Sequence, residues 1–189
     1  MNRTTDVRIV RWDRAQFVAR AREAMTIYAD AMDYPARVVP NRTGYARSHA
    51  ERPGFRAVAA VGADETLVGF GYGYTTAPGQ WWHDQVAVAI SVESAHWLTG
   101  SFELCELHVT PSRQGGGLGR ALLLALLDGV EHRAVLLSTP EGESRAWRLY
   151  RSLGFVDLAR HHLFPGDSRP FAVLGARLPL AGCAAPTHA

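Results

Sequence analysis

The chain has 189 residues, of which 47% are hydrophobic and 20% charged, and its formal net charge is +2. This length and composition are typical of one globular domain and argue against a disordered or fibrous protein. All 20 basic residues are arginine, which excludes mechanisms that need a lysine amine, such as a pyridoxal Schiff base or a triphosphate loop ending in Lys-Ser/Thr. The small net charge and the scattered arginines argue against a nucleic-acid partner.

Targeting and membrane signals are weak in this sequence. The first residues are charged and lack the apolar core of a secretory signal. The longest strongly apolar run, residues 121–127, is far shorter than the roughly 20 residues that a membrane span needs. Two cysteines, Cys105 and Cys183, are too few for a disulfide framework. We therefore expect a cytoplasmic protein without a membrane partner.

The first half of the chain predicts strands and helices in alternation. Asp13 is placed to cap a first helix, and Pro35 ends it because the residue before a proline is pushed out of the helical region. Apolar alternation and turn residues predict strands over 6–12, 55–61 and 67–74. Two further helices are predicted over 42–51 and 84–97.

The second half continues this alternation, and its pattern indicates a single mixed α/β domain over residues 1–180. Strands are predicted over 102–109, 134–138, 155–164 and 170–178, and helices over 120–133 and 144–153. The last residues, 181–189, are expected to form a frayed tail.

The strongest functional signal is the glycine-rich turn over residues 114–119, which joins a strand to a helix. Glycines let successive main-chain N–H groups point into one concavity, and the helix behind them adds unsatisfied N–H groups and partial positive charge. Such a turn can hold a phosphate or diphosphate, with Arg113 and Arg120 as counter-charges. The glycine spacing does not fit the dinucleotide fingerprint.

Two motifs together resemble the GNAT superfamily of acyl-CoA N-acyltransferases. The run Gln114-Gly-Gly-Gly117-Leu-Gly119, after a strand ending in Leu107-His-Val109, resembles the family's coenzyme-A-binding motif. The segment Ser144–Phe155 resembles the second signature, A-x-x-L-Y-x-x-L-G-F. Its matches are Ala146, Leu149, Tyr150, Leu153, Gly154 and Phe155. The resemblance covers residues 102–164 and implies a single-domain GNAT fold. In that fold, helices flank a mixed central sheet of about six to seven strands, splayed at the cofactor site.

This resemblance implies that acetyl-CoA is the co-substrate and that no metal takes part. The pantetheine arm is expected to pair with the main chain of Leu107, His108 and Val109, which offers free N–H and C=O groups. The diphosphate is expected on the turn and the helix start. The residues implied there are Gln114, Gly115, Gly116, Gly117, Leu118, Gly119 and Arg120.

The reaction, attack of an amine on a thioester, sets the candidate catalytic residues. An alkyl ammonium of pKa ~10.4 is almost fully protonated at pH 7, so a base is needed. Glu103 and Glu106 are the candidates; a regular strand directs them to opposite faces, and Glu103 is slightly favoured. By resemblance, the Tyr150 hydroxyl lies near the thioester sulfur and stabilises its developing charge. Many members of the family have Asn where this chain has Glu143. The Asn amide can donate a hydrogen bond, whereas an ionised glutamate can only accept one.

Aromatic side chains before the cofactor strand are candidates for an acceptor pocket, although helix packing explains the tryptophans equally well. They are Tyr34, Tyr72, Tyr74, Trp81 and Trp82. The adjacent His161 and His162 point to opposite sides of a strand and do not suggest a metal site. The predicted function is direct acetyl transfer to a primary amine of a small molecule or peptide, by a monomer or homodimer. The alternative is a non-catalytic module that binds or senses acyl-CoA.

Overall fold

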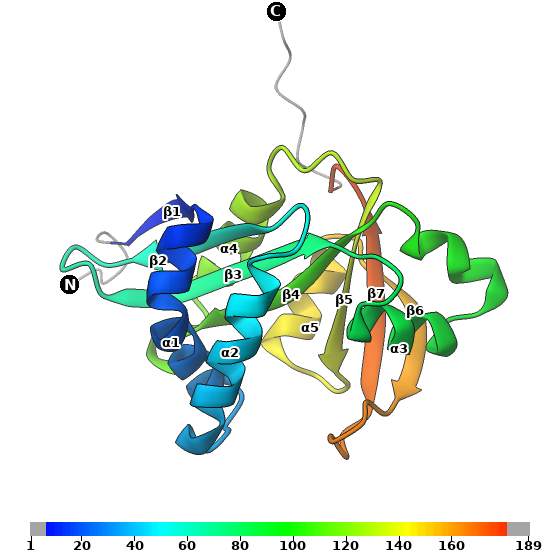
Figure 1. The fold of residues 1–189 in the computed structure, drawn as a ribbon, viewed down its shortest axis with the longest axis horizontal. Helices are drawn as coiled ribbons and strands as arrows, with labels where there is room; N and C mark the ends of the chain where they lie inside the picture. Colours follow the sequence, from blue (N-terminus) through cyan, green and yellow to red (C-terminus); the bar gives the residue numbers. More distant parts are fainter. Residues whose placement is uncertain (1–6, 181–189) are drawn as a thin grey trace, which may run out of the picture. The chain divides into compact units, whose positions relative to one another are not determined.

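The computed structural model describes residues 7–180, which form a seven-stranded mixed sheet flanked by helices (Figure 1). The helices are α1 (Arg14–Ala31), α2 (Val39–His49), α3 (Trp81–Ala89), α4 (Leu118–Leu127) and α5 (Arg145–Ser152). The strands are β1 (Arg8–Trp12), β2 (Arg56–Val61), β3 (Leu67–Thr75), β4 (Phe102–Val109), β5 (Ala134–Pro140), β6 (Val156–His162) and β7 (Phe171–Arg177). Three short 3-10 helices are η1 (Ala36–Val38), η2 (Val92–Leu98) and η3 (Pro111–Arg113). Hydrogen bonding orders the strands β1-β2-β3-β4-β5-β7-β6, which confirms the predicted mixed sheet.

The chain divides into two compact units, and β4 passes from one to the other. The first unit holds the residues up to Tyr74 together with Leu104–Asp128, and the second holds Thr75–Glu103 with the residues from Gly129 onward. The single-domain boundary at residue 180 stays a prediction. Within residues 7–180, no helix is both long and apolar enough to cross a membrane.

In the first unit, helices cover both faces of the antiparallel strands β1, β2 and β3. Alternation along β3 decides which helix each residue meets. The Tyr72 ring lies 4.9 Å from that of Phe17 on α1. A Cβ at the next position back, Gly71, would come within 4 Å of Leu126 on α4. Glycines on that side of β3 therefore let α4 approach closely, while aromatic residues on the other side build the core under α1 and α2.

Helix α1 begins as the sequence predicts and ends slightly earlier. Asp13 accepts a hydrogen bond from the Gln16 N–H, and the Gln16 side chain accepts one from the Asp13 N–H, forming a capping box. The helix ends at Ala31, before the predicted stop at Pro35, because Asp33 adopts a left-handed conformation (φ 56°). The predicted second helix is confirmed as α2, which begins three residues earlier than expected.

In the second unit, β5 and β7 carry the core. Phe102 and Glu103 of β4 pair with β5 in parallel, and β7 lies antiparallel to both β5 and β6. Apolar residues of these strands pack against α3 and η2. Of these three strand pairings, only the one between β4 and β5 is parallel.

Two predicted helices have the wrong bounds. The helix predicted over 84–97 is α3 followed by η2, because Ile90 is extended and the Ser91 hydroxyl accepts a hydrogen bond from the Ser94 N–H, which competes with helix continuation. The helix predicted over 120–133 spans Leu118–Leu127, because Asp128 is extended and Gly129 is left-handed (φ 70°). The residues expected to form the tail, 181–189, and the start of the first predicted strand lie outside the described residues.

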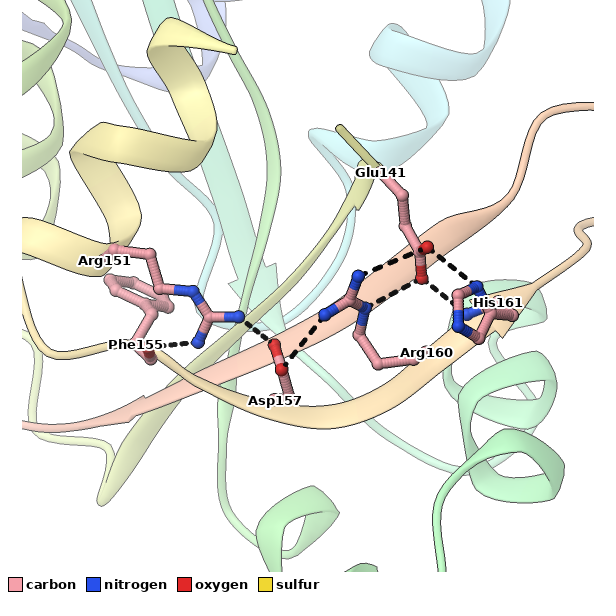
Figure 2. Close-up of polar contacts among 6 residues, drawn as sticks. All are labelled: Glu141, Arg151, Phe155, Asp157, Arg160 and His161. Atoms are coloured by element: carbon pink, nitrogen blue, oxygen red, sulfur yellow. Dashed lines mark hydrogen bonds and ion pairs between the residues drawn. The ribbon is translucent and has the colours of Figure 1, made fainter. Parts of the chain in front are cut away.

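A network of ion pairs links α5 to β6 in the second unit (Figure 2). Arg151 of α5 pairs with Asp157 of β6, which Arg160 also contacts. Arg160 pairs in turn with Glu141 at 2.9 Å, as does the His161 Nδ1 atom. The hydrogen bond from Arg160 is the main cause that lowers the pKa of Glu141 to about 2, so this carboxyl stays ionised throughout the neutral range. The pair of Arg151 and Asp157 ties the last turn of α5, which carries Tyr150, to β6.

Candidate active site

The glycine-rich turn follows β4 and η3, and its geometry explains why glycines occupy it. Gly115 and Gly117 have φ values of 87° and 82°, a left-handed conformation that side-chain-bearing residues rarely adopt. The Gln114 amide donates to the Val109 carbonyl at 3.0 Å, which ties the turn back to the end of β4. The turn is therefore held in one shape by its main chain and by a local side-chain bond.

Helix α4 opens directly onto this turn. Gly117 is its N-cap, and no side chain of the described residues caps the helix there. Gly115, Gly116 and Gly117 are exposed, and no atom lies within 4 Å of a Cβ built at Gly116 or Gly117. The first-turn N–H groups of a helix lack partners within the helix and carry partial positive charge. The arrangement is thus suited to bind an anion through the main chain.

A carboxylate and an imidazole lie together on β4. The Glu106 Oε2 and His108 Nε2 atoms are 2.6 Å apart, and the two side chains are only 16% and 12% exposed. Tyr28 of α1 packs edge-on against the His108 ring, with ring centroids 5.1 Å apart. Burial and the negative charge of Glu106 both raise the pKa of Tyr28 well above its ordinary value of 10. The pair thus lies in a largely desolvated part of the first unit.

A second polar cluster surrounds Cys105 in the same unit. The Cys105 sulfur lies 3.5 Å from both the Tyr72 hydroxyl and the His49 Nδ1 atom. The Tyr74 hydroxyl donates to the same sulfur at 3.7 Å, and the Arg52 guanidinium stacks on the Tyr74 ring. Tyr72 and Tyr74 are 2% and 1% exposed. Their hydroxyls therefore contact Cys105 of β4 inside the unit, and a role of these two tyrosines in acceptor binding stays a prediction.

Acidification is expected to destabilise the protein through His49. Burial, with the charges of Arg52 and Arg42, lowers the pKa of His49 from 6.5 to about 4. The unfolded chain therefore binds the proton first: stability is intact above pH 6.5 and falls by about 3 kcal/mol as the pH drops toward 4. Urea unfolding at pH 7, 5.5 and 4.5 measures this slope. The His49→Gln variant should flatten it, and His96→Gln, at an exposed site on η2, should not. Equal slopes in all three proteins would contradict the assignment.

The remaining predicted site residues of the first unit and of β4 have distinct environments. Tyr34 is half-buried, with its ring centroid 5.5 Å from that of Tyr28. Glu103 is 2% exposed and pairs with Leu136 of β5 through the main chain, in the second unit. The preference for Glu103 over Glu106 as the base stays a prediction.

In the second unit, the local sequence positions Tyr150 through α5. The Ser144 hydroxyl caps the helix by accepting from the Trp147 N–H at 3.1 Å. Tyr150 is 7% exposed, and its ring centroid lies 5.3 Å from that of Phe155. Its carbonyl accepts from the N–H groups of Leu153 and Phe155, and Gly154 takes the left-handed conformation that this turn requires (φ 83°). The signature Tyr-x-x-Leu-Gly-Phe is therefore one closed turn.

The two tryptophans predicted for the acceptor pocket have different environments. Trp82 is buried, and its indole N–H donates to the Ser138 hydroxyl at 2.9 Å, so it packs in the core of the second unit. Trp81 is 54% exposed and lies with its ring 5.7 Å from that of Phe164. Trp82 is thus packed in the core and Trp81 is not, and a role of either tryptophan in acceptor binding stays a prediction.

The site predicted from the sequence includes His108 only through its main chain, and it does not include Tyr28 or His49. The spacing of Glu106 and His108 could have signalled the first of these, since residues two apart on a strand share a face. No local pattern could have indicated the ring of Tyr28, which α1 supplies from a distant part of the sequence.

Comparison with known proteins shows the family of this chain. The model of the GNAT acetyltransferase family matches residues 21–155. A GCN5-like protein acetyltransferase of Mycobacterium tuberculosis is 44% identical to this chain, and the match covers 85% of this chain and 93% of that protein. The chain belongs to the GNAT acetyltransferase family. It is therefore an acyltransferase, as the two sequence motifs predict.

Solved structures show the same fold for this GNAT chain. The protein yncA of Salmonella typhimurium, solved with its cofactor acetyl-CoA, has a TM-score of 0.65 at 18% identity, covering 98% of this chain and 100% of that one. A GNAT-family protein of Desulfovibrio desulfuricans has a TM-score of 0.63 at 19% identity, covering 90% and 98%. The spermidine N-acetyltransferase of Vibrio cholerae has a TM-score of 0.59 at 15% identity, covering 92% and 95%. The predicted GNAT fold is thus confirmed.

Proposed function

We propose that this GNAT acetyltransferase transfers the acetyl group of acetyl-CoA directly to a primary amine of a protein or peptide. The observation that carries the proposal is the uncapped N-terminus of α4, which opens onto three exposed glycines. This feature supports a diphosphate held by the N–H groups of the turn and of the first turn of α4. The exposed Arg120 is available as a counter-charge.

The remainder of the cofactor is proposed to lie along β4. Its ladder with β5 comprises Phe102 and Glu103, and pantetheine amides would pair with main-chain groups of Leu107, His108 and Val109 farther along. Pantetheine carries both amide donors and acceptors, so it can satisfy strand N–H and C=O groups. Acetyl-CoA bound to the Salmonella typhimurium protein, which shares the fold, is consistent with this co-substrate.

A protein amine is favoured as the acceptor by the relative from Mycobacterium tuberculosis, a protein acetyltransferase that matches most of both chains. The acceptor reaches the enzyme as an ammonium ion and must lose a proton before it can attack the thioester. A carboxylate of β4, from Glu103 or Glu106, supplies negative charge for this step. Tyr150 donates a hydrogen bond to the sulfur as the C–S bond breaks.

Thiol release from acetyl-CoA tests the proposal. The expected result is release with peptides that carry a lysine or a free α-amine, accompanied by a mass increase of the peptide. Small polyamines and N-acetylated, lysine-free peptides serve as comparison acceptors. Because the chain contains no lysine, the enzyme itself cannot be acetylated on a side-chain amine, which leaves the assay with little background. Tight CoA binding without thiol release for any amine would overturn the proposal.

A further inference from the structure

The contact between Glu106 and His108 gives the candidate site a second proton-accepting group. The two side chains lie on the same face of β4, two residues apart, and their nearest polar atoms are 2.6 Å apart. Both are largely buried, so water screens their interaction only weakly. A short contact between a carboxylate and an imidazole nitrogen in such a place orients the ring.

Aromatic neighbours hold the imidazole in this orientation. The Tyr28 ring meets the His108 ring edge-on, with an interplanar angle of 88°. Phe70 of β3 packs on the same ring with centroids 5.7 Å apart. Arg42 of α2 stacks on Tyr28 at 5.0 Å, which supports that ring in turn. His108 is therefore fixed by contacts from α1 and β3 as well as by Glu106.

The pairing also decides which nitrogen of His108 can accept a proton. An ionised carboxylate can only accept, so the Glu106 contact places the ring proton on Nε2 and leaves a lone pair on Nδ1. No residue in the described part of the chain forms a hydrogen bond with Nδ1 of His108. An imidazole nitrogen that carries a lone pair can take up a proton, and histidine is the side chain most often used as a general base.

We propose that His108 accepts the proton of the acceptor ammonium at Nδ1, with Glu106 as the positioning residue that fixes its tautomer. The inference rests on the proposed function. The ammonium gives one proton to Nδ1, and its nitrogen forms a bond to the acetyl carbon while the carbon–sulfur bond breaks. A second proton of the nitrogen ends on the CoA sulfur, and His108 returns its proton to solvent. One amide, one thiol and one proton result.

The test compares His108→Asn with His161→Asn, a matched variant at another carboxylate–imidazole pair, which lies in the ion-pair network of β6. At pH 7 the first variant should lose about a hundredfold in kcat/KM, within the range of general-base catalysis. As the pH rises, the solution supplies more of the free amine, so the loss of kcat/KM relative to wild type should shrink by about tenfold per pH unit. His161→Asn should follow the wild-type profile. Calorimetry should give the same CoA affinity for all three proteins.

A second measurement reads the tautomer without activity. Nitrogen NMR of wild-type protein labelled at histidine should show the proton of neutral His108 on Nε2. The variant Glu106→Ala should lose this preference. When Glu106→Ala is already present, adding His108→Asn should lower kcat/KM far less than it does in the wild type, because the two residues act as a unit.

The outcomes separate this inference from the function on which it rests. A His108→Asn variant within about threefold of wild type, with an unchanged pH profile, overturns the role of His108 and leaves the proposed function standing. A neutral His108 with its proton on Nδ1 overturns it as well. Absence of thiol release from the wild-type enzyme with every amine overturns the proposed function, and the inference falls with it.

Discussion

Replacement of Gly116 by glutamate is expected to lower the affinity for CoA by about a hundredfold. Like charges about 5 Å apart repel by about 3 kcal/mol at an effective dielectric constant of about 20, which corresponds to this loss. Gly116 is exposed, no atom lies within 4 Å of a Cβ built there, and its φ lies outside the left-handed region. The fold should therefore accept the side chain, and the loss should come from the charge in front of α4. Isothermal calorimetry with CoA measures it.

The matched control for this prediction is Gly116→Gln, which has the same length and no charge. It should bind CoA within about tenfold of wild type. Added salt should narrow the gap between the two variants, because ions screen an exposed charge. Equal affinities for Gly116→Glu and Gly116→Gln at low salt would show that the diphosphate does not lie on this turn. A similar comparison at Gly117 would be harder to interpret, because any side chain there also strains the left-handed backbone.

Replacement of Tyr150 by phenylalanine is expected to lower kcat by about a hundredfold while CoA affinity stays within a few-fold of wild type. Removing one preorganised hydrogen-bond donor to developing negative charge typically costs between about a hundredfold and a thousandfold in kcat. Phenylalanine preserves the ring that packs on Phe155 and the main-chain bonds that close the end of α5. The change should thus remove the hydroxyl alone, and steady-state thiol release measures its effect.

Tyr45→Phe is the control for this substitution, because Tyr45 is 54% exposed on α2 and has no assigned role. It should have the kcat of the wild type. Thermal unfolding of both variants shows whether the fold is preserved. If Tyr150→Phe retains full kcat with a normal melting temperature, the tyrosine does not stabilise the leaving thiolate.

Local signals in the sequence predicted the elements that depend on neighbouring residues. The helix cap at Asp13 is confirmed, and the strands β2, β3 and β4 lie within one residue of their predicted bounds. Helix ends were predicted less well. Helix α3 ends at Ala89, with Ile90 as its C-cap, because Ser91 caps a new 3-10 helix. Apolar periodicity does not reveal this competition.

Local segments of the chain were enough to predict the GNAT family and to predict an anion site at the glycine-rich turn. Both follow from short segments whose chemistry belongs to the main chain: glycines that free N–H groups, and a helix that starts directly behind them. The surroundings of Glu106 and His108 became visible in the folded chain. Their contact, and the rings of Tyr28 and Phe70 that hold it, join α1, β3 and β4. Packing between elements distant in sequence places the rings of Tyr28 and Phe70 on His108, and no local pattern encodes that packing.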